Sequence, residues 1–230
     1  MSFALFTYGG LIFLLRWIHF LAAFTWIGML YYFNFVQGPY FGEADASSKS
    51  NAIQKLLPRA LWWFRWGAMF TMISGVLLFG MNGNFDMHNP QALLISIGML
   101  IALVMWFNVW FVIWPAQKVV IQSATQAASG GQPLPEAAAR GARALVASRT
   151  NVLFSVPMLF FMGSASHLGV QISATANTGM LMGVLTLIIG ALEFNALKGK
   201  LGPLTTVKGV IHCGLALTVV MYLIVEVLTK

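Results

Sequence analysis

The sequence predicts an all-α fold, a polytopic membrane bundle of six transmembrane helices with its N and C termini in the periplasm. Composition is the first reason, because 59% of the residues are hydrophobic, only 8% are charged, and the mean hydropathy is +0.80. Soluble domains of this size hardly reach such values. The second reason is a series of apolar segments, each near the roughly 20 helical residues that cross a hydrocarbon core. The third is that the basic residues between these segments occur in alternate loops.

These segments form one expected integral membrane domain over residues 1–230, placed in the bacterial inner membrane as a multi-pass protein with the lipid bilayer as its partner. The net charge of +7 then reflects loop topology and not nucleic-acid binding. The expected spans lie at about 10–36, 60–80, 91–120, 150–171, 178–197 and 207–228.

The first span contains Leu11 to Tyr32, and we expect Gln37-Gly38-Pro39 to end it. The polar stretch that follows holds Ile53 and Leu56 at helical spacing, with lysines among them. This pattern predicts a short amphipathic helix over Ala44–Leu57 that lies at the membrane interface.

The second span opens with Trp62-Trp63-Phe64-Arg65-Trp66. Indole rings around a cation suit a membrane interface, which is one interpretation of this element. The other is that Arg65 binds an anionic propionate group of a cofactor. The turn-rich loop Met81–Pro90 follows and holds His88 beside Asp86. A loop histidine without a spaced partner is only a weak candidate for a site.

In the third span, Pro115 should kink the helix or mark its exit from the membrane. The segment Glu136–Ser148 favours helix and should lead directly into the fourth span. The fifth span carries Glu193 near its end. Because the topology puts both Glu193 and Arg65 in the cytoplasmic half, we expect them to form an ion pair inside the bundle.

Loop charges set the orientation. The connections after spans one, three and five are basic, whereas those after spans two and four contain neither Lys nor Arg. The positive-inside rule therefore places the basic connections in the cytoplasm and both termini outside. The basic residues are Lys49, Lys55, Arg59, Lys118, Arg140, Arg143, Arg149, Lys198, Lys200 and Lys208.

His19 is the leading candidate for a functional residue, because it lies near the middle of the first span. Trp26 follows seven residues later, which is two helical turns along the same face. An ionisable ring at this depth needs a partner, and haem iron, copper, a buried carboxylate or a proton path are the options. The alternative is a neutral imidazole bonded to a Ser, a Thr or a backbone carbonyl of a neighbouring helix.

Two further histidines lie at depths that a shared metal could reach. Counted at 1.5 Å per residue, His19 lies roughly 13 Å, His167 roughly 6 Å and His212 roughly 22 Å below the outer face. His19 can therefore pair with either of the others across the bundle, as bis-imidazole ligation of haem requires. We expect a haem b whose metal ligands come from His19, His167 and His212, with Trp26 and Arg65 as further cofactor-binding residues.

Copper is the alternative metal, since imidazole and thioether groups both bind it. The 13 methionines are scattered through the spans, however, so we favour haem. Cys213 is the only cysteine, which excludes an internal disulfide and a C-x-x-C-H site for covalent haem attachment. Any haem here would be held by axial ligands alone.

Several motifs resemble the membrane domain of bacterial urate hydroxylases, also called the urate oxidase N-terminal family. The first-span part, His-x6-Trp-x-Gly, is also similar to the membrane protoporphyrinogen oxidase and copper-resistance D families. The motifs are Arg16-Trp17-Ile18-His19 with Trp26-Ile27-Gly28, Asn108-Val109-Trp110-Phe111-Val112-Ile113 with Pro115-Ala116-Gln117, Ser148-Arg149-Thr150-Asn151, Ser155-Val156-Pro157-Met158-Leu159-Phe160-Phe161-Met162, and Ser166-His167.

The resemblance implies a membrane oxidoreductase that oxidises urate and hands electrons to cytochrome c. Since the sequence contains no C-x-x-C-H, a separate periplasmic c-type cytochrome would be the acceptor. A second function remains open, in which the protein is a non-catalytic membrane module, either a copper permease or a structural subunit beside other membrane subunits.

Overall fold

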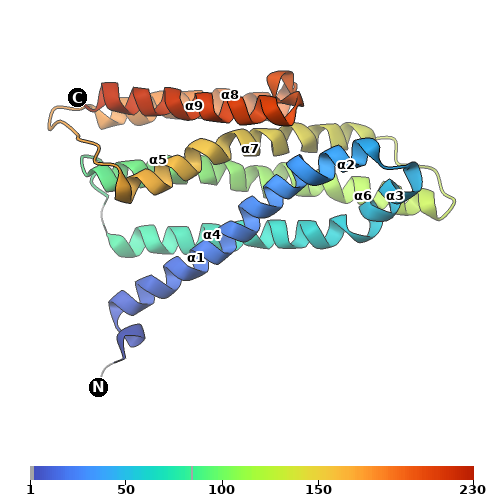
Figure 1. Ribbon diagram of the computed structural model, residues 1–230, viewed down its shortest axis with the longest axis horizontal. Helices are drawn as coiled ribbons and strands as arrows, with labels where there is room; N and C mark the ends of the chain where they lie inside the picture. Colours follow the sequence, from blue (N-terminus) through green and yellow to red (C-terminus); the bar gives the residue numbers. More distant parts are fainter. Residues whose placement is uncertain (1–2, 84) are drawn as a thin grey trace.

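The structure, a computed structural model, describes residues 3–83 and 85–230. Throughout this part of the chain the secondary structure is helical, and six helices are long and apolar enough to cross a membrane, which confirms the expected fold class. The helices run along one axis, with both chain termini at the same end (Figure 1). We call this the terminal end. The opposite end, which holds the turns at 44–45, 129–136 and 199–206, is the basic end.

The chain builds a bundle of long helices with short helical pieces between them. The long helices are α1 (Tyr8–Tyr31), α4 (Leu57–Asn82), α5 (Pro90–Phe107), α6 (Trp114–Ala128), α7 (Ala137–His167), α8 (Thr178–Lys198) and α9 (Val207–Leu228). The short pieces are the 3-10 turns η1 (Ala4–Phe6) and η4 (Gly202–Thr205), helices α2 (Gly38–Glu43) and α3 (Ala46–Lys55), and the π-helical turns η2 (Tyr32–Gln37) and η3 (Asn108–Ile113).

Neither Pro39 nor Pro115 ends its helix, and for Pro39 this corrects the expected end of the first span. The first span does not stop at Gln37-Gly38-Pro39 but continues through η2 and α2 to Glu43. The third likewise continues past Pro115 through α6 to Ala128. Each proline lies in the first turn of its new helix, where a backbone N–H is not needed, and each follows a π-helical turn that has already widened the hydrogen-bond ladder.

Helix ends follow their local sequence. The Asp45 carboxylate accepts from the backbone N–H groups of Ser47 and Ser48, so it caps α3, the helix expected over Ala44–Leu57. The side chain of Asn89 caps α5, with Pro90 in the first turn. Helix α4 ends instead at Gly83, whose φ of 64° is a left-handed conformation that favours glycine.

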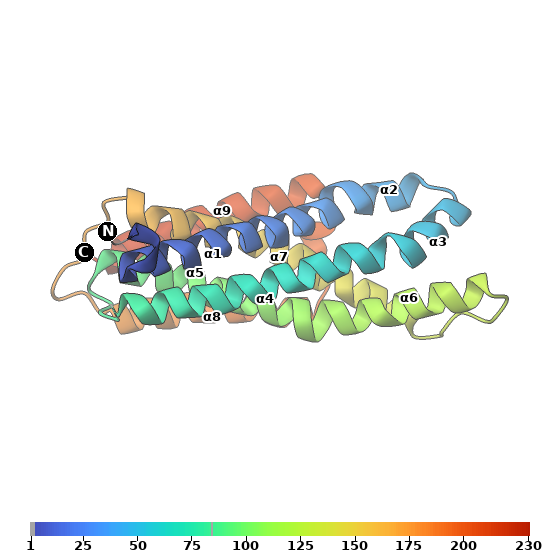
Figure 2. The same cartoon turned by 90° about the horizontal axis from the view of Figure 1, so that it is seen from below.

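Helix α7 is the centre of the bundle. It packs against α5, α6, α8 and α9, and more lightly against α1, while α1 packs chiefly along α4. Glycines bring helices close together. A Cβ atom on Gly67 of α4 would lie 3.0 Å from the backbone nitrogen of Trp26 in α1, and one on Gly214 of α9 would lie 2.7 Å from Cγ2 of Val156 in α7. Figure 2 shows the same helices from a second side.

The outer helices present apolar side chains on their exposed faces. Phe24 of α1 is 76% exposed and Leu187 of α8 is 75% exposed, and many other large apolar residues of α1, α4, α8 and α9 are similarly uncovered. A soluble protein would not tolerate so much exposed apolar surface, whereas lipid tails cover it without cost. The protein is a multi-pass membrane protein.

Candidate functional site

The imidazole of His19 is held between α1 and α4. Its Nδ1 atom lies 3.0 Å from Oγ of Ser74, and the Ser74 hydroxyl lies 2.6 Å from the carbonyl oxygen of Phe70 in its own helix. Because a hydroxyl has only one hydrogen and this one is donated to a carbonyl, Nδ1 of His19 must donate to Ser74. The lone pair of the neutral ring is therefore on Nε2. Metal-binding histidines are commonly oriented in this way by their second nitrogen.

The backbone of α4 also fixes the position of this ring. A Cβ atom on Gly75 would lie 3.1 Å from Cε1 of His19, so only glycine leaves room for the imidazole at its present distance. The alternative interpretation of His19 was a neutral imidazole bonded to a Ser, a Thr or a backbone carbonyl of a neighbouring helix. Ser74 is such a partner. His19 is therefore oriented and hydrogen-bonded by the protein alone.

His19 and His167 both lie on the terminal side of one contact between α1 and α7. Tyr31 of α1 and Ser155 of α7 are joined through their hydroxyl oxygens at 2.9 Å, and the two helices run in opposite directions. Twelve residues from this contact toward the terminal end lead to His19 on α1 and to His167 on α7. Each histidine therefore lies about 18 Å of helix from this contact, on its terminal side.

The surface of α7 between these positions is open. The face that carries Ser155 continues through Leu159, Gly163 and Ser166, all of which are exposed, and Leu159 is 47% exposed. Figure 1 shows the reason, because α1 runs obliquely and leaves α7 as it approaches the terminal end. His167 itself is exposed, as the last residue of α7.

His212 lies elsewhere along the bundle axis, near the contact of Tyr31 with Ser155. It lies two residues from Gly214, which packs against Val156, and both α7 and α9 run from the basic end to the terminal end. His212 is therefore level with the residues near Phe154, about 20 Å along the bundle axis from His167. Its side chain is exposed.

Trp26 and Arg65 occupy different surroundings. Trp26 is 1% exposed, and its indole Nε1 is buried without a hydrogen-bond partner. Arg65 is half-buried and places its guanidinium carbon 3.6 Å from the ring centre of Trp114 and 5.5 Å from that of Trp110. Arg65 precedes Gly75 by ten residues, or about 15 Å of helix, so it does not reach the His19 ring.

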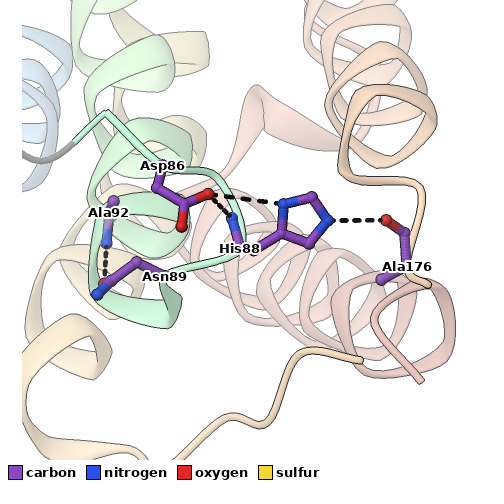
Figure 3. Close-up of polar contacts among 5 residues, drawn as sticks. All are labelled: Asp86, His88, Asn89, Ala92 and Ala176. Carbon is purple, nitrogen blue, oxygen red and sulfur yellow. Dashed lines mark hydrogen bonds and ion pairs between the residues drawn. The ribbon is translucent and has the colours of Figure 1, made fainter. Parts of the chain in front are cut away.

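His88 links two connections at the terminal end (Figure 3). Its Nε2 lies 3.3 Å from the carbonyl oxygen of Ala176, in the connection between α7 and α8. Its Nδ1 lies 3.6 Å from a carboxylate oxygen of Asp86, which also accepts from the backbone N–H of His88 at 2.9 Å. These contacts make His88 a structural tie between loops, away from the membrane interior.

A second polar cluster lies toward the basic end, and the sequence-based expectations did not include it. Asn108 in η3 donates through Nδ2 to Oδ1 of Asn151 in α7 and to Oε2 of Glu193 in α8, each at 2.9 Å. Asn151 donates in turn to the carbonyl of Met105 at 2.9 Å. Both asparagines are fully buried. The signal in the sequence was one carboxamide in each of two apolar spans together with a carboxylate in a third.

The expected ion pair between Arg65 and Glu193 is wrong. In the described residues, the ion pairs within 4.0 Å are His88 with Asp86 and Lys230 with Glu226. Arg65 packs on the Trp114 ring and Glu193 accepts from Asn108, so the two groups have different partners.

Comparison with known proteins adds one finding. A family model described as urate oxidase N-terminal matches residues 82–225 of the chain, more than half of its length. The matched range contains His167, Asn108, Asn151 and Glu193 and begins after His19. No curated protein and no solved structure matches the chain.

Proposed function

Because the chain belongs to the urate oxidase N-terminal family, we propose that it is a membrane-bound redox protein of urate oxidation. In this proposal it binds a b-type haem and passes electrons to a separate c-type cytochrome. The observation that carries the haem is that two imidazoles lie on the terminal side of the contact between α1 and α7, each twelve residues from it: His19, whose Nε2 lone pair is free, and His167 on α7.

The residues present suit such a cofactor. His19 and His167 would hold it, and the face of α7 at Leu159 and Gly163 is not covered by other helices. The buried indole Nε1 of Trp26 lacks an acceptor, so it is available as a donor on the same face of α1 as His19. When bound, the haem would supply a one-electron redox centre whose potential its ligands and surroundings set. Ser74 would keep the His19 ring in its metal-binding orientation.

Haem is better supported than copper. Haem iron needs only two axial side chains from the protein, whereas a protein copper site draws all its ligands from side chains.

The proposed orientation puts the basic end in the cytoplasm of a bacterium and both termini in the periplasm. His19 and His167 then lie in the periplasmic half of the membrane, where a c-type cytochrome could accept electrons at short range. Because the bundle would separate the cytoplasm from the periplasm, the proposed location of the protein is the inner membrane.

A second candidate function is a non-catalytic membrane module, such as a copper permease or a structural subunit of a larger complex. One observation favours it: the His19 imidazole already has a hydrogen-bond partner in Ser74 and needs no metal to be satisfied.

The visible spectrum of the purified full-length protein separates the two functions. The redox function requires a Soret band and, on reduction, an α-band. It further requires that urate, added without oxygen, reduces this haem, while the solvent control does not. A colourless preparation that takes up no haem on reconstitution would contradict the redox proposal and support the membrane module.

A further inference from the structure

The hydrogen bonds around Glu193 have a direction that the backbone determines. Asn151 faces the carbonyl of Met105, so its amide nitrogen must point there and its oxygen must point to Asn108. Because Oδ1 of Asn151 needs a donor, the Nδ2 atom of Asn108 must be the one that points toward it. The second hydrogen of the same nitrogen is donated to Oε2 of Glu193. Asn108 thus donates in two directions, to Glu193 and to Asn151, and Asn151 donates in turn to a backbone carbonyl that can only accept.

Two buried oxygen atoms are left without a donor at the end of this relay. They are Oε1 of Glu193 and Oδ1 of Asn108. Both belong to residues joined by one 2.9 Å hydrogen bond, so the two oxygens lie in the same small region of the bundle. A buried acceptor that lacks a donor loses its hydrogen bonds to water without replacement, so it is unfavourable for the pair to remain unmatched.

Glu193 makes no ion pair within 4.0 Å in the described part of the chain. Of the elements packed against α8, α5 and η3 carry no titratable side chain. In α7, Arg143 donates to the carbonyls of Ala196 and Gly199, and Arg149 lies two residues from Asn151, on the opposite face of the helix. The remaining titratable groups of α7 and α9 make no ion pair with Glu193. They are Arg140, His167, Lys208, His212, Cys213, Tyr222 and Glu226.

From this geometry we propose that Glu193 is a proton-binding site inside the membrane. A proton from solvent adds to Oε1 and converts the carboxylate to the neutral acid. The new O–H donates to one internal water, and the water donates to Oδ1 of Asn108. Both unmatched oxygens then have a partner and no net charge stays buried, while loss of the proton restores the carboxylate.

The position of Glu193 suits exchange with the basic end. It precedes the last residue of α8, Lys198, by five residues, or about 8 Å of helix, and it is half-buried whereas Asn108 is fully buried. The site is independent of His19, because it lies on other helices and needs neither haem nor urate.

Infrared spectroscopy of the full-length protein at neutral pH tests this proposal. We expect a carbonyl stretching band of a protonated carboxylic acid that shifts in D₂O, is lost in Glu193→Gln and persists in Glu226→Gln. Glu226 is the matched control, because it is also a membrane-helix carboxylate but is paired with Lys230 and Tyr222. Absence of the band from the wild type, or its persistence in Glu193→Gln, would overturn the proposal.

A labelling experiment on the unaltered protein covers the case in which Glu193→Gln does not fold. A membrane-soluble carbodiimide reacts with protonated carboxyl groups. Mass spectrometry should find its adduct on the peptide with Glu193 at neutral pH and not on the peptide with Glu136, which is exposed at the basic end. Equal labelling of the two, or none at Glu193, would contradict the proposed proton.

Discussion

The hydroxyl groups of Tyr31 and Ser155 lie 2.9 Å apart, across 124 residues of sequence, and this contact sets α1 against α7. Ser155 donates its own hydrogen to the Val152 carbonyl at 2.7 Å, so Tyr31 is the donor between the helices. This register puts His19 and His167 each twelve residues from the contact, on its terminal side.

Removing the Tyr31 hydroxyl should loosen the contact without leaving Ser155 unpaired. We expect Tyr31→Phe to lower the free energy of unfolding by about 0.5–1.5 kcal/mol, the net value of one hydrogen bond. Thermal unfolding in detergent measures it, with Tyr32→Phe as the control on the next residue. Equal stability of the two variants would mean that the contact does not hold α1 against α7.

Close packing between α1 and α4 depends on one glycine. In Gly67→Ala the added Cβ would lie 3.0 Å from the backbone nitrogen of Trp26 and 3.2 Å from the carbonyl of Ala22, and backbone atoms cannot move aside. We expect a loss of about 1–3 kcal/mol in thermal unfolding. Gly80→Ala, on the same helix with no atom within 4 Å, should be neutral or stabilising. A neutral Gly67→Ala would show that the helices are not packed this closely.

The charge of Arg65 is stabilised by an aromatic ring. With the guanidinium carbon 3.6 Å from the Trp114 ring centre, a double-mutant cycle with Arg65→Gln and Trp114→Leu should give a coupling of about 0.5–2 kcal/mol. The cycle of Arg65→Gln with Glu193→Gln should be additive, because those two groups do not pair. Coupling in the second cycle and none in the first would reverse this assignment.

The long apolar spans could be predicted from sequence because their signal is length and composition, which no distant contact alters. The continuation of the first span past Pro39 could not, because proline is tolerated in the first turn of a helix that follows a π-helical turn. Whether the helix continues depends on the backbone hydrogen bonds of the preceding turn and not on the proline itself.

For the candidate site, depth alone pointed to His19 but left His167 and His212 equal. Only the contacts of Tyr31 with Ser155 and of Gly214 with Val156 fix the register that separates them. The depths of Arg65 and Glu193 likewise could not predict their partners, since opposite charges at one depth can face different helices. The Arg65 guanidinium packs on the indole ring of Trp114, and Glu193 accepts from Asn108.

The orientation can be tested with single cysteines at the two ends of the bundle. In a Cys213→Ser background, Ala174→Cys lies at the terminal end and Ser129→Cys at the basic end, and both positions are exposed. A membrane-impermeant maleimide added to intact cells should label only Ala174→Cys, because the positive-inside rule puts the basic end in the cytoplasm. Labelling of Ser129→Cys alone would invert the bundle and place His19 in the cytoplasmic half.

The visible spectrum of His19→Ala is the decisive measurement for the haem assignment. If His19 is an axial ligand of a b-type haem, this variant should insert into the membrane normally and lose the haem spectrum, because an apolar residue inserts at least as readily. His167→Ala should change a six-coordinate spectrum to a five-coordinate one, while His212→Ala and His88→Ala should leave it unchanged. An unaltered haem spectrum in His19→Ala would contradict the assignment and leave His19 as an imidazole held only by Ser74.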